Sequence, residues 1–259
     1  MQKITIKKIQ QKKNDTPITC LTAYSKNIAK IADKYCDIIL VGDSLGMVLY
    51  GMKTTRDVKI ETMILHAKAV KNFAKKSLVV FDMPYKTYAN KFTAYKNAKR
   101  VIKLTKCDAI KLEGGIKIVN VIKYLVKKGI PVMGHVGLMP QTSTNFKVKG
   151  KNFVQKKKIL KDALAISNSG VFAIIIECVV ENLARKITKS VSIPTIGIGA
   201  SRYCDGQILV TEDMLGLSDF SPKFVKQYAN LNKIMEKSIK NYVKDVKMRR
   251  FPSFKNVYR

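Results

Sequence analysis

The stretch IILVGDSLGM, residues 38–47, determines how the rest of the chain is expected to fold. Its first four residues are apolar and mostly β-branched, which predicts a strand buried on both faces, as in parallel sheets. Gly42 and Gly46 flank Asp43 and Ser44, and glycine lets the backbone turn sharply where the strand ends. A carboxylate and a hydroxyl therefore stand at the carboxyl end of a buried strand, where parallel α/β folds place their chemistry.

Similar short apolar runs recur along the chain, and amphipathic stretches such as Thr93–Lys106 lie between them. The expected strands are Ile18–Thr22, Ile38–Val41, Leu78–Phe81, Ala109–Leu112, Pro131–Gly134, Phe172–Ile176, Pro194–Gly197 and Gln207–Val210. Eight β-then-α units without a linker predict a (β/α)8 TIM barrel. A doubly wound open sheet is the alternative, although eight strands would be many for it.

The barrel is expected to form a single domain over residues 1–259, because no linker divides the chain. An amphipathic segment at about residues 1–12 is expected to cap the floor of the barrel. A helix over about residues 223–246 is expected to pack against the barrel or against a neighbouring subunit.

The charge balance is unusual, with 49 Lys and Arg against 18 Asp and Glu, a net charge of +31. Such an excess can indicate a nucleic-acid partner. However, the lysines are spread along the chain without a long basic tail, which favours compositional drift, so we expect no nucleic-acid partner. The five cysteines form no CxxC pair and indicate buried free thiols in a reducing compartment. No signal peptide or run of about 18 apolar residues occurs, which predicts a cytoplasmic protein without a membrane partner.

Four of the few acidic residues directly follow or close an apolar run: Asp43, Asp82, Glu113 and Glu177. Helix capping could explain one or two of them. Four carboxylates at one rim of a barrel would repel one another unless they share a proton or a cation. Mg²⁺ suits such oxygen ligands, whereas zinc is disfavoured because the chain has only two histidines, far apart in sequence.

Two further polar residues are expected at the same rim. Lys111 lies two residues before Glu113, so both side chains point to the same side of a strand. A lysine directed into the mouth of a barrel needs an anion, for which a substrate carboxylate is suited, and a snorkelling lysine is the alternative. His135 closes the run PVMGH and either faces the mouth or is a satisfied core residue. His66 falls within the helical run Glu61–Lys76 and is interpreted as structural.

These residues also carry a resemblance. The motifs are TAY (22–24), VGDSLGM (41–47), FDMPY (81–85), IKLEGG (110–115), GHVGLMPQ (134–141), IIECV (175–179), IPTIGIGA (193–200) and CDGQILV (204–210). In this order and at these separations they resemble the 3-methyl-2-oxobutanoate hydroxymethyltransferase (ketopantoate hydroxymethyltransferase) family over nearly the whole chain.

The resemblance implies a (β/α)8 barrel of the phosphoenolpyruvate/pyruvate-like kind, commonly assembled as a homodecamer. It implies transfer of a hydroxymethyl group from 5,10-methylenetetrahydrofolate to 3-methyl-2-oxobutanoate. The products would be 2-dehydropantoate and tetrahydrofolate, in the first step of pantothenate and coenzyme A biosynthesis.

The resemblance also implies the site residues. Asp43, Asp82 and Glu113 would hold one Mg²⁺ per subunit, and Asp43, Ser44, Asp82 and Lys111 would bind the keto acid, with a looser assignment for His135. Glu177 would be the catalytic base that forms a Mg²⁺-stabilised enolate, and its place at the end of an apolar strand is expected to raise its proton affinity.

The chain departs from the family pattern after Gln141, where the loop TSTNFKVKG is about three residues shorter and lacks a glycine pair. This departure concerns the folate side, whereas the metal and keto-acid side is retained. The main alternative is a Mg²⁺-dependent C–C lyase of the isocitrate lyase/phosphoenolpyruvate mutase type. Such lyases often use a reactive cysteine in a lid loop, and none of the five cysteines lies in a comparable loop.

Overall fold

The computed structural model describes residues 2–143, 146–218 and 222–258. It divides into two compact units, Met1–Val210 and Thr211–Arg259. Met1 of the expected cap and residues 144–145 of the shortened loop lie outside the described residues. That residues 1–259 form one domain stays a prediction.

The first unit is built around a closed barrel of parallel strands in the sequential order β1 to β8. The strands are β1 (Ile18–Thr22), β2 (Ile38–Val41), β3 (Leu78–Asp82), β4 (Ala109–Glu113), β5 (Val132–Gly137), β6 (Ala173–Glu177), β7 (Thr195–Ile198) and β8 (Gly206–Leu209). Each strand pairs in parallel with the next, and β8 closes the ring by pairing with β1. The barrel fold predicted from the alternating pattern is confirmed.

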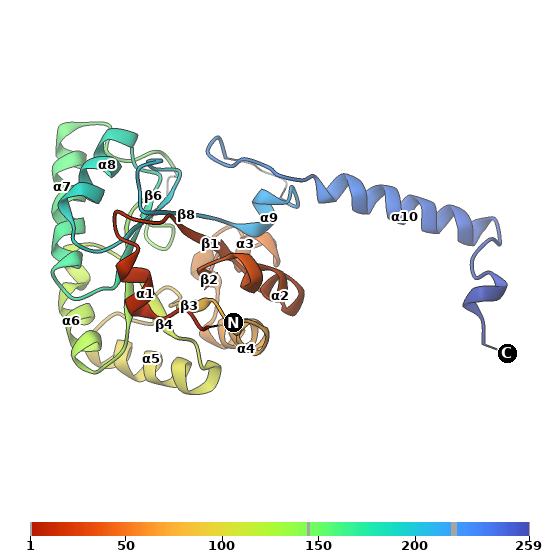
Figure 1. The fold of residues 1–259 in the computed structure, drawn as a ribbon, viewed down its shortest axis with the longest axis horizontal. Coiled ribbons are helices and arrows are strands. Elements are labelled where there is room, and N and C mark those ends of the chain that lie inside the picture. Colours follow the sequence, from red (N-terminus) through yellow and green to blue (C-terminus); the bar gives the residue numbers. More distant parts are fainter. Residues whose placement is uncertain (1, 144–145, 219–221, 259) are drawn as a thin grey trace. The chain divides into compact units, whose positions relative to one another are not determined.

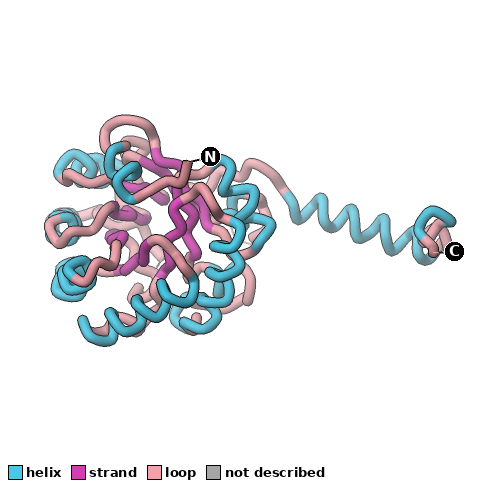
Figure 2. The backbone as a smooth tube through the Cα atoms, turned by 60° about the horizontal axis from the view of Figure 1, so that its bottom comes forward, coloured by secondary structure: helices cyan, strands magenta, loops and turns pink. Residues whose placement is uncertain are grey.

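Helices surround the strands of this unit (Figures 1 and 2). They are α1 (Ile6–Gln11), α2 (Lys26–Tyr35), α3 (Leu45–Val48), α4 (Ile60–Phe73), α5 (Lys91–Thr105), α6 (Val119–Lys127), α7 (Phe153–Ser167) and α8 (Glu181–Ser190), with 3-10 turns η1 (Thr55–Asp57) and η2 (Ile116–Ile118). Residues 199–205, between β7 and β8, are described throughout and form no helix.

Alternation along each strand separates two apolar layers. In β4, Ile110 and Leu112 belong to the outer core beneath the helices, whereas Ala109 belongs to the smaller core inside the barrel. Because side chains alternate with a period of two, Lys111 and Glu113 share the inner side with Ala109. The inside of the barrel is therefore apolar at its amino-terminal end and polar at its carboxyl-terminal end.

The N-terminal segment closes the apolar end of the barrel. Ile4 and Ile9 are buried with strand residues of the inner core, including Ile18 and Leu78. Three lysines of this segment each pair with an aspartate that precedes a strand: Lys3 with Asp108 at 2.5 Å, Lys12 with Asp37 at 2.7 Å, and Lys13 with Asp205 at 2.9 Å.

The second unit contains α9 (Thr211–Met214), α10 (Leu231–Lys247) and η3 (Phe254–Asn256). The helix expected over residues 223–246 begins later, at Leu231, because Asn230 is its N-cap and accepts a hydrogen bond from the backbone N–H of Lys233 at 3.1 Å. Across the described stretches of both units, no helix is long and apolar enough to span a bilayer.

Candidate active site

The four strand-end carboxylates lie at one end of the barrel, as the sequence pattern predicts. Asp82, Glu113 and Glu177 are the last residues of β3, β4 and β6, and Asp43 follows β2. Asp43, Asp82 and Glu113 are at most 6% exposed, whereas the Glu177 side chain is 19% exposed. None of these four residues is an N-cap; Ser44 is the N-cap of α3, and Asn90 that of α5.

Lys111 forms a buried ion pair with Asp82. Asp82 lies beside Lys111 in the β3–β4 register, and Lys111 Nζ is 2.7 Å from Asp82 Oδ2. Burial alone would lower the pKa of Lys111, but the charges of Asp82, Asp43 and Glu113 outweigh it and raise this pKa. The sequence predicted an anionic partner for Lys111, and in this structure the partner is a carboxylate of the protein itself.

Burial raises the pKa values of Asp43 and Glu113 above their ordinary range. Burial, followed by the neighbouring charge of Asp82, raises the pKa of Asp43 to about 8. The backbone N–H of Asp43 also donates to Asp82 Oδ2 at 3.3 Å, so the two residues are adjacent. Burial raises the pKa of Glu113 well above its ordinary value, despite the opposing charge of Lys111. The repulsion expected from the sequence is therefore present at this rim.

His135 lies between two carboxylates. Its Nε2 is 3.3 Å from Glu177 Oε2, and its Nδ1 is 3.6 Å from Glu113 Oε2. Neither ring nitrogen has a hydrogen bond of good geometry to a described residue. Burial and then the charge of Lys111 lower the pKa of His135. The neutral imidazole therefore faces the mouth of the barrel, one of the two orientations left open by the sequence.

Ser44 lies at the edge of the same site. It is partly buried at the start of α3, and its Oγ is 2.7 Å from the hydroxyl of Tyr24. His66, which the sequence indicates as structural, contacts the carbonyl of Tyr24 through Nδ1 at 2.6 Å and the hydroxyl of Tyr50 through Nε2 at 2.9 Å.

Sequence reasoning missed three residues that bind this cluster. Gln141 follows β5, is fully buried, and donates from Nε2 to Asp43 Oδ2 at 2.8 Å. The Tyr88 hydroxyl and the Arg56 Nε in turn donate to the Gln141 side-chain and backbone oxygens. The available signal was a polar residue after the end of a buried strand, in the sequence Pro140-Gln141.

The donor set fits a hard divalent cation. Asp82 Oδ1 is buried and has no hydrogen-bond partner among the described residues, and carboxylate oxygens are the ligands that Mg²⁺ prefers. Within residues 2–143, 146–218 and 222–258, no three His, Cys, Asp or Glu side chains are placed to coordinate one ion together. Lys111 and Gln141 instead occupy one oxygen each of Asp82 and Asp43.

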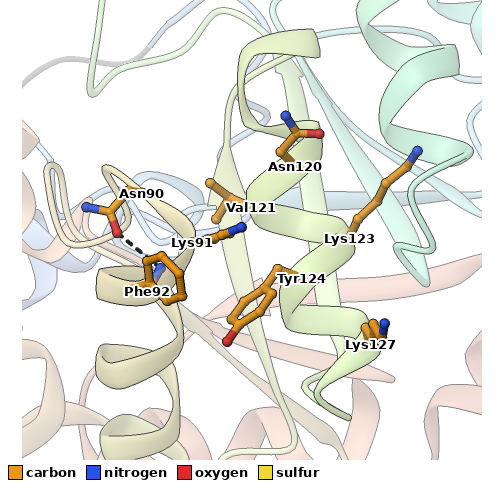
Figure 3. Close-up of a pocket in the computed structure, with 8 residues that line it drawn as sticks. All are labelled: Asn90, Lys91, Phe92, Asn120, Val121, Lys123, Tyr124 and Lys127. Atoms are coloured by element: carbon orange, nitrogen blue, oxygen red, sulfur yellow. Dashed lines mark hydrogen bonds between the residues drawn. The ribbon is translucent and has the colours of Figure 1, made fainter.

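A separate groove lies outside the barrel between α5 and α6 (Figure 3). Its volume is about 600 Å³, and Phe92 and Tyr124 line it together with Lys91, Lys123 and Lys127. None of the strand-end residues lines this groove. The chemistry predicted from the sequence therefore belongs to the barrel mouth.

Comparison with known proteins identifies the family of this chain. The family model described as ketopantoate hydroxymethyltransferase matches residues 3–254. A 3-methyl-2-oxobutanoate hydroxymethyltransferase of Pelagibacter ubique (strain HTCC1062) is 53% identical over 248 residues, covering 96% of each chain.

Two solved structures have a similar fold at 11% sequence identity. A phosphonopyruvate hydrolase complex with oxalate and Mg²⁺ has a TM-score of 0.62, covering 97% of this chain and 93% of that one. A 2,3-dimethylmalate lyase of the PEP mutase/isocitrate lyase superfamily has a TM-score of 0.63, covering 98% and 88%. These two likenesses establish the fold alone, whereas the family match extends over nearly the whole sequence. The chain belongs to the ketopantoate hydroxymethyltransferase family.

Proposed function

We propose that this chain transfers a hydroxymethyl group from 5,10-methylenetetrahydrofolate to 3-methyl-2-oxobutanoate, consuming one water and giving 2-dehydropantoate and tetrahydrofolate. Membership of the family supports the reaction. The observation that carries the proposal is the cluster at the barrel mouth, where Asp43, Asp82 and Glu113 lie around Lys111. Glu177 lies in the same cluster, and His135 lies between it and Glu113.

We propose that Asp43, Asp82 and Glu113 hold one Mg²⁺ per subunit. Two observations support this assignment: Asp82 Oδ1 is buried without a hydrogen-bond partner in the described part of the chain, and these carboxylates repel one another. A similarly folded phosphonopyruvate hydrolase was solved with Mg²⁺ and oxalate. When bound, Mg²⁺ would polarise the keto group and stabilise the negative charge that remains after proton removal.

The protein's own residues would bind the keto acid and move its proton. Lys111 would exchange its contact with Asp82 for the substrate carboxylate, which Ser44 would also orient. Glu177 would accept the proton from C3, and this carbon would then attack the methylene carbon of the folate as one of the two methylene C–N bonds breaks. Water would replace the remaining nitrogen, supply the oxygen of the hydroxymethyl group and release tetrahydrofolate. Neutral His135, 3.3 Å from Glu177 Oε2, would donate a hydrogen bond that orients this carboxylate.

The test is loss of the C3 proton of 3-methyl-2-oxobutanoate in D₂O, followed by proton NMR with Mg²⁺ and without folate. We expect Mg²⁺-dependent exchange that falls about 10²–10⁴-fold in Glu177→Gln, the usual contribution of a general base. Glu61→Gln is the matched control, because Glu61 is exposed on α4, where it pairs with Arg100. A folded wild-type protein without exchange, with or without tetrahydrofolate, would contradict the proposal.

A Mg²⁺-dependent C–C lyase is the second candidate, favoured by the fold shared with 2,3-dimethylmalate lyase. It predicts cleavage of 2-alkylmalates or related acids without any folate. All five cysteines are buried free thiols, and burial raises the pKa of Cys178, which follows Glu177, to about 12. These inert thiols favour the transferase over a lyase that uses a reactive cysteine.

From the family resemblance we also propose a homodecamer in the cytoplasm. Light scattering coupled to size exclusion would give the mass of the assembly relative to the chain mass of 29.1 kDa. Fractionation of cells that express the protein would test the compartment.

A further inference from the structure

Gln141 is a buried residue at the barrel mouth whose side chain and backbone both make hydrogen bonds. It lies in a turn after β5, outside any regular element, and is 0% exposed. A buried carboxamide is costly unless its polar atoms are paired. Its partners therefore indicate what the residue does.

The carboxamide of Gln141 has one orientation only. Its Nε2 donates to Asp43 Oδ2 at 2.8 Å and to the carbonyl of Met83 at 3.0 Å, which uses both amide protons. Its Oε1 accepts from the Tyr88 hydroxyl at 2.5 Å. A flipped amide would place an oxygen against a carboxylate and a carbonyl, so Asp43 always faces the donor end.

The backbone of Gln141 makes two more links. Its N–H donates to Glu113 Oε1 at 2.9 Å, and its carbonyl accepts from Arg56 Nε at 2.9 Å. Gln141 thus links three parts of the barrel mouth: Asp43 after β2, Glu113 at the end of β4, and the 3-10 turn η1. Asp43 Oδ2 and Glu113 Oε1 are therefore each held by a hydrogen bond from Gln141.

We propose that Gln141 is a positioning residue, which fixes the orientation of Asp43 and Glu113 so that each presents its second oxygen to the bound cation. This inference rests on the proposed function, in which both carboxylates are Mg²⁺ ligands. The side chain acts on Asp43 and the backbone N–H acts on Glu113, so a side-chain variant removes the contact with Asp43, together with those to Met83 and Tyr88, and keeps the contact with Glu113. Residues that orient metal ligands commonly change metal affinity or activity by about 10–100-fold when substituted.

The test measures Mn²⁺ binding by electron paramagnetic resonance, which requires no turnover. Gln141→Leu keeps the approximate size of the side chain and removes its hydrogen bonds. We expect Mn²⁺ binding to weaken by about 10–100-fold. Thr142→Ala, an exposed position in the same turn, is the matched control and should bind Mn²⁺ as the wild type does.

A second variant covers the case in which Gln141→Leu does not fold. Tyr88→Phe removes only a hydroxyl, which contacts the carboxamide at 2.5 Å and the Glu113 carbonyl oxygen at 3.2 Å. We expect binding to weaken by about two- to tenfold, the effect of one hydrogen bond. In steady-state assays, kcat/KM of either variant should recover when Mg²⁺ is raised to saturation. A purely structural role would lower activity equally at all Mg²⁺ concentrations and would contradict the proposal.

Asp82→Asn separates the two proposals. If wild type binds Mn²⁺, Asp82→Asn does not, and folded Gln141→Leu binds like wild type, the positioning role is wrong and the proposed function stands. If wild type binds no Mn²⁺, or if Asp82→Asn binds as tightly, the carboxylate metal site is wrong and the role of Gln141 falls with it.

Discussion

Replacing Lys111 by methionine should destabilise the metal-free protein strongly. The change removes the cation of an ion pair in which Lys111 Nζ lies 2.7 Å from Asp82 Oδ2, with side chains 6% and 2% exposed. At an effective dielectric constant of about 20, unit charges about 3 Å apart attract by about 5–6 kcal/mol. Desolvation offsets part of this, and removing one partner of a buried pair typically costs about 3–5 kcal/mol. We expect a loss of that size in the free energy of unfolding.

The assay is urea unfolding followed by circular dichroism at pH 8 without divalent cations. The pKa of Lys111 is raised above its ordinary value of 10.5, so its stabilisation is fully present at pH 8 and is lost only as pH rises through the folded pKa. Lys96→Met, an exposed residue on α5, is the matched control and should change stability by less than about 0.5 kcal/mol.

The variant should also respond differently to pH. Without Lys111, lowering the pH from 8 to 5 protonates the carboxylates that have lost their cation, so the deficit relative to wild type should shrink. A deficit below about 1 kcal/mol at pH 8, or one that does not shrink on acidification, would refute the buried ion pair as the source of this stability.

Three further substitutions test the barrel mouth and floor. Asp43→Asn should raise the free energy of unfolding of the metal-free protein more at pH 8 than at pH 5, because the folded-state pKa of Asp43 is raised from 3.8 to about 8 and wild-type stability falls as pH rises between them. Lys13→Met, which removes the 2.9 Å ion pair with Asp205 at the barrel floor, should lower the free energy of unfolding by about 1–3 kcal/mol without changing Mn²⁺ affinity. Gly137→Ala should reduce kcat more than Mn²⁺ affinity, because φ is +104° there and a Cβ would lie 2.3 Å from the Glu177 carbonyl oxygen.

Each of these has a contradicting outcome. Equal stabilisation of Asp43→Asn at both pH values would show that the carboxyl group does not titrate in this range. Weaker Mn²⁺ binding in Lys13→Met would couple the floor to the mouth of the barrel. Wild-type kcat in Gly137→Ala would show that the backbone at the end of β5 has room to move away from Glu177.

The sequence by itself determined the barrel and the end at which its polar residues gather. Period-two alternation predicts that the side chains of Lys111 and Glu113 point to the same side of their strand. In the structure both are buried at the end of β4. Parallel strands present their carboxyl ends at one rim, so acidic residues at four strand ends had to meet. These conclusions follow from local periodicity and strand polarity, which are properties of the chain in one dimension.

Only the tertiary structure decided which polar residues pair with one another at the barrel mouth. Strand register places Asp82 beside Lys111, and a sequence pattern does not encode register between strands that are far apart in the chain. The contact of Gln141 with Asp43 joins residues 98 positions apart. Hydrogen bonds depend on tenths of an ångström and on burial, which arise only when all eight strands close into the barrel.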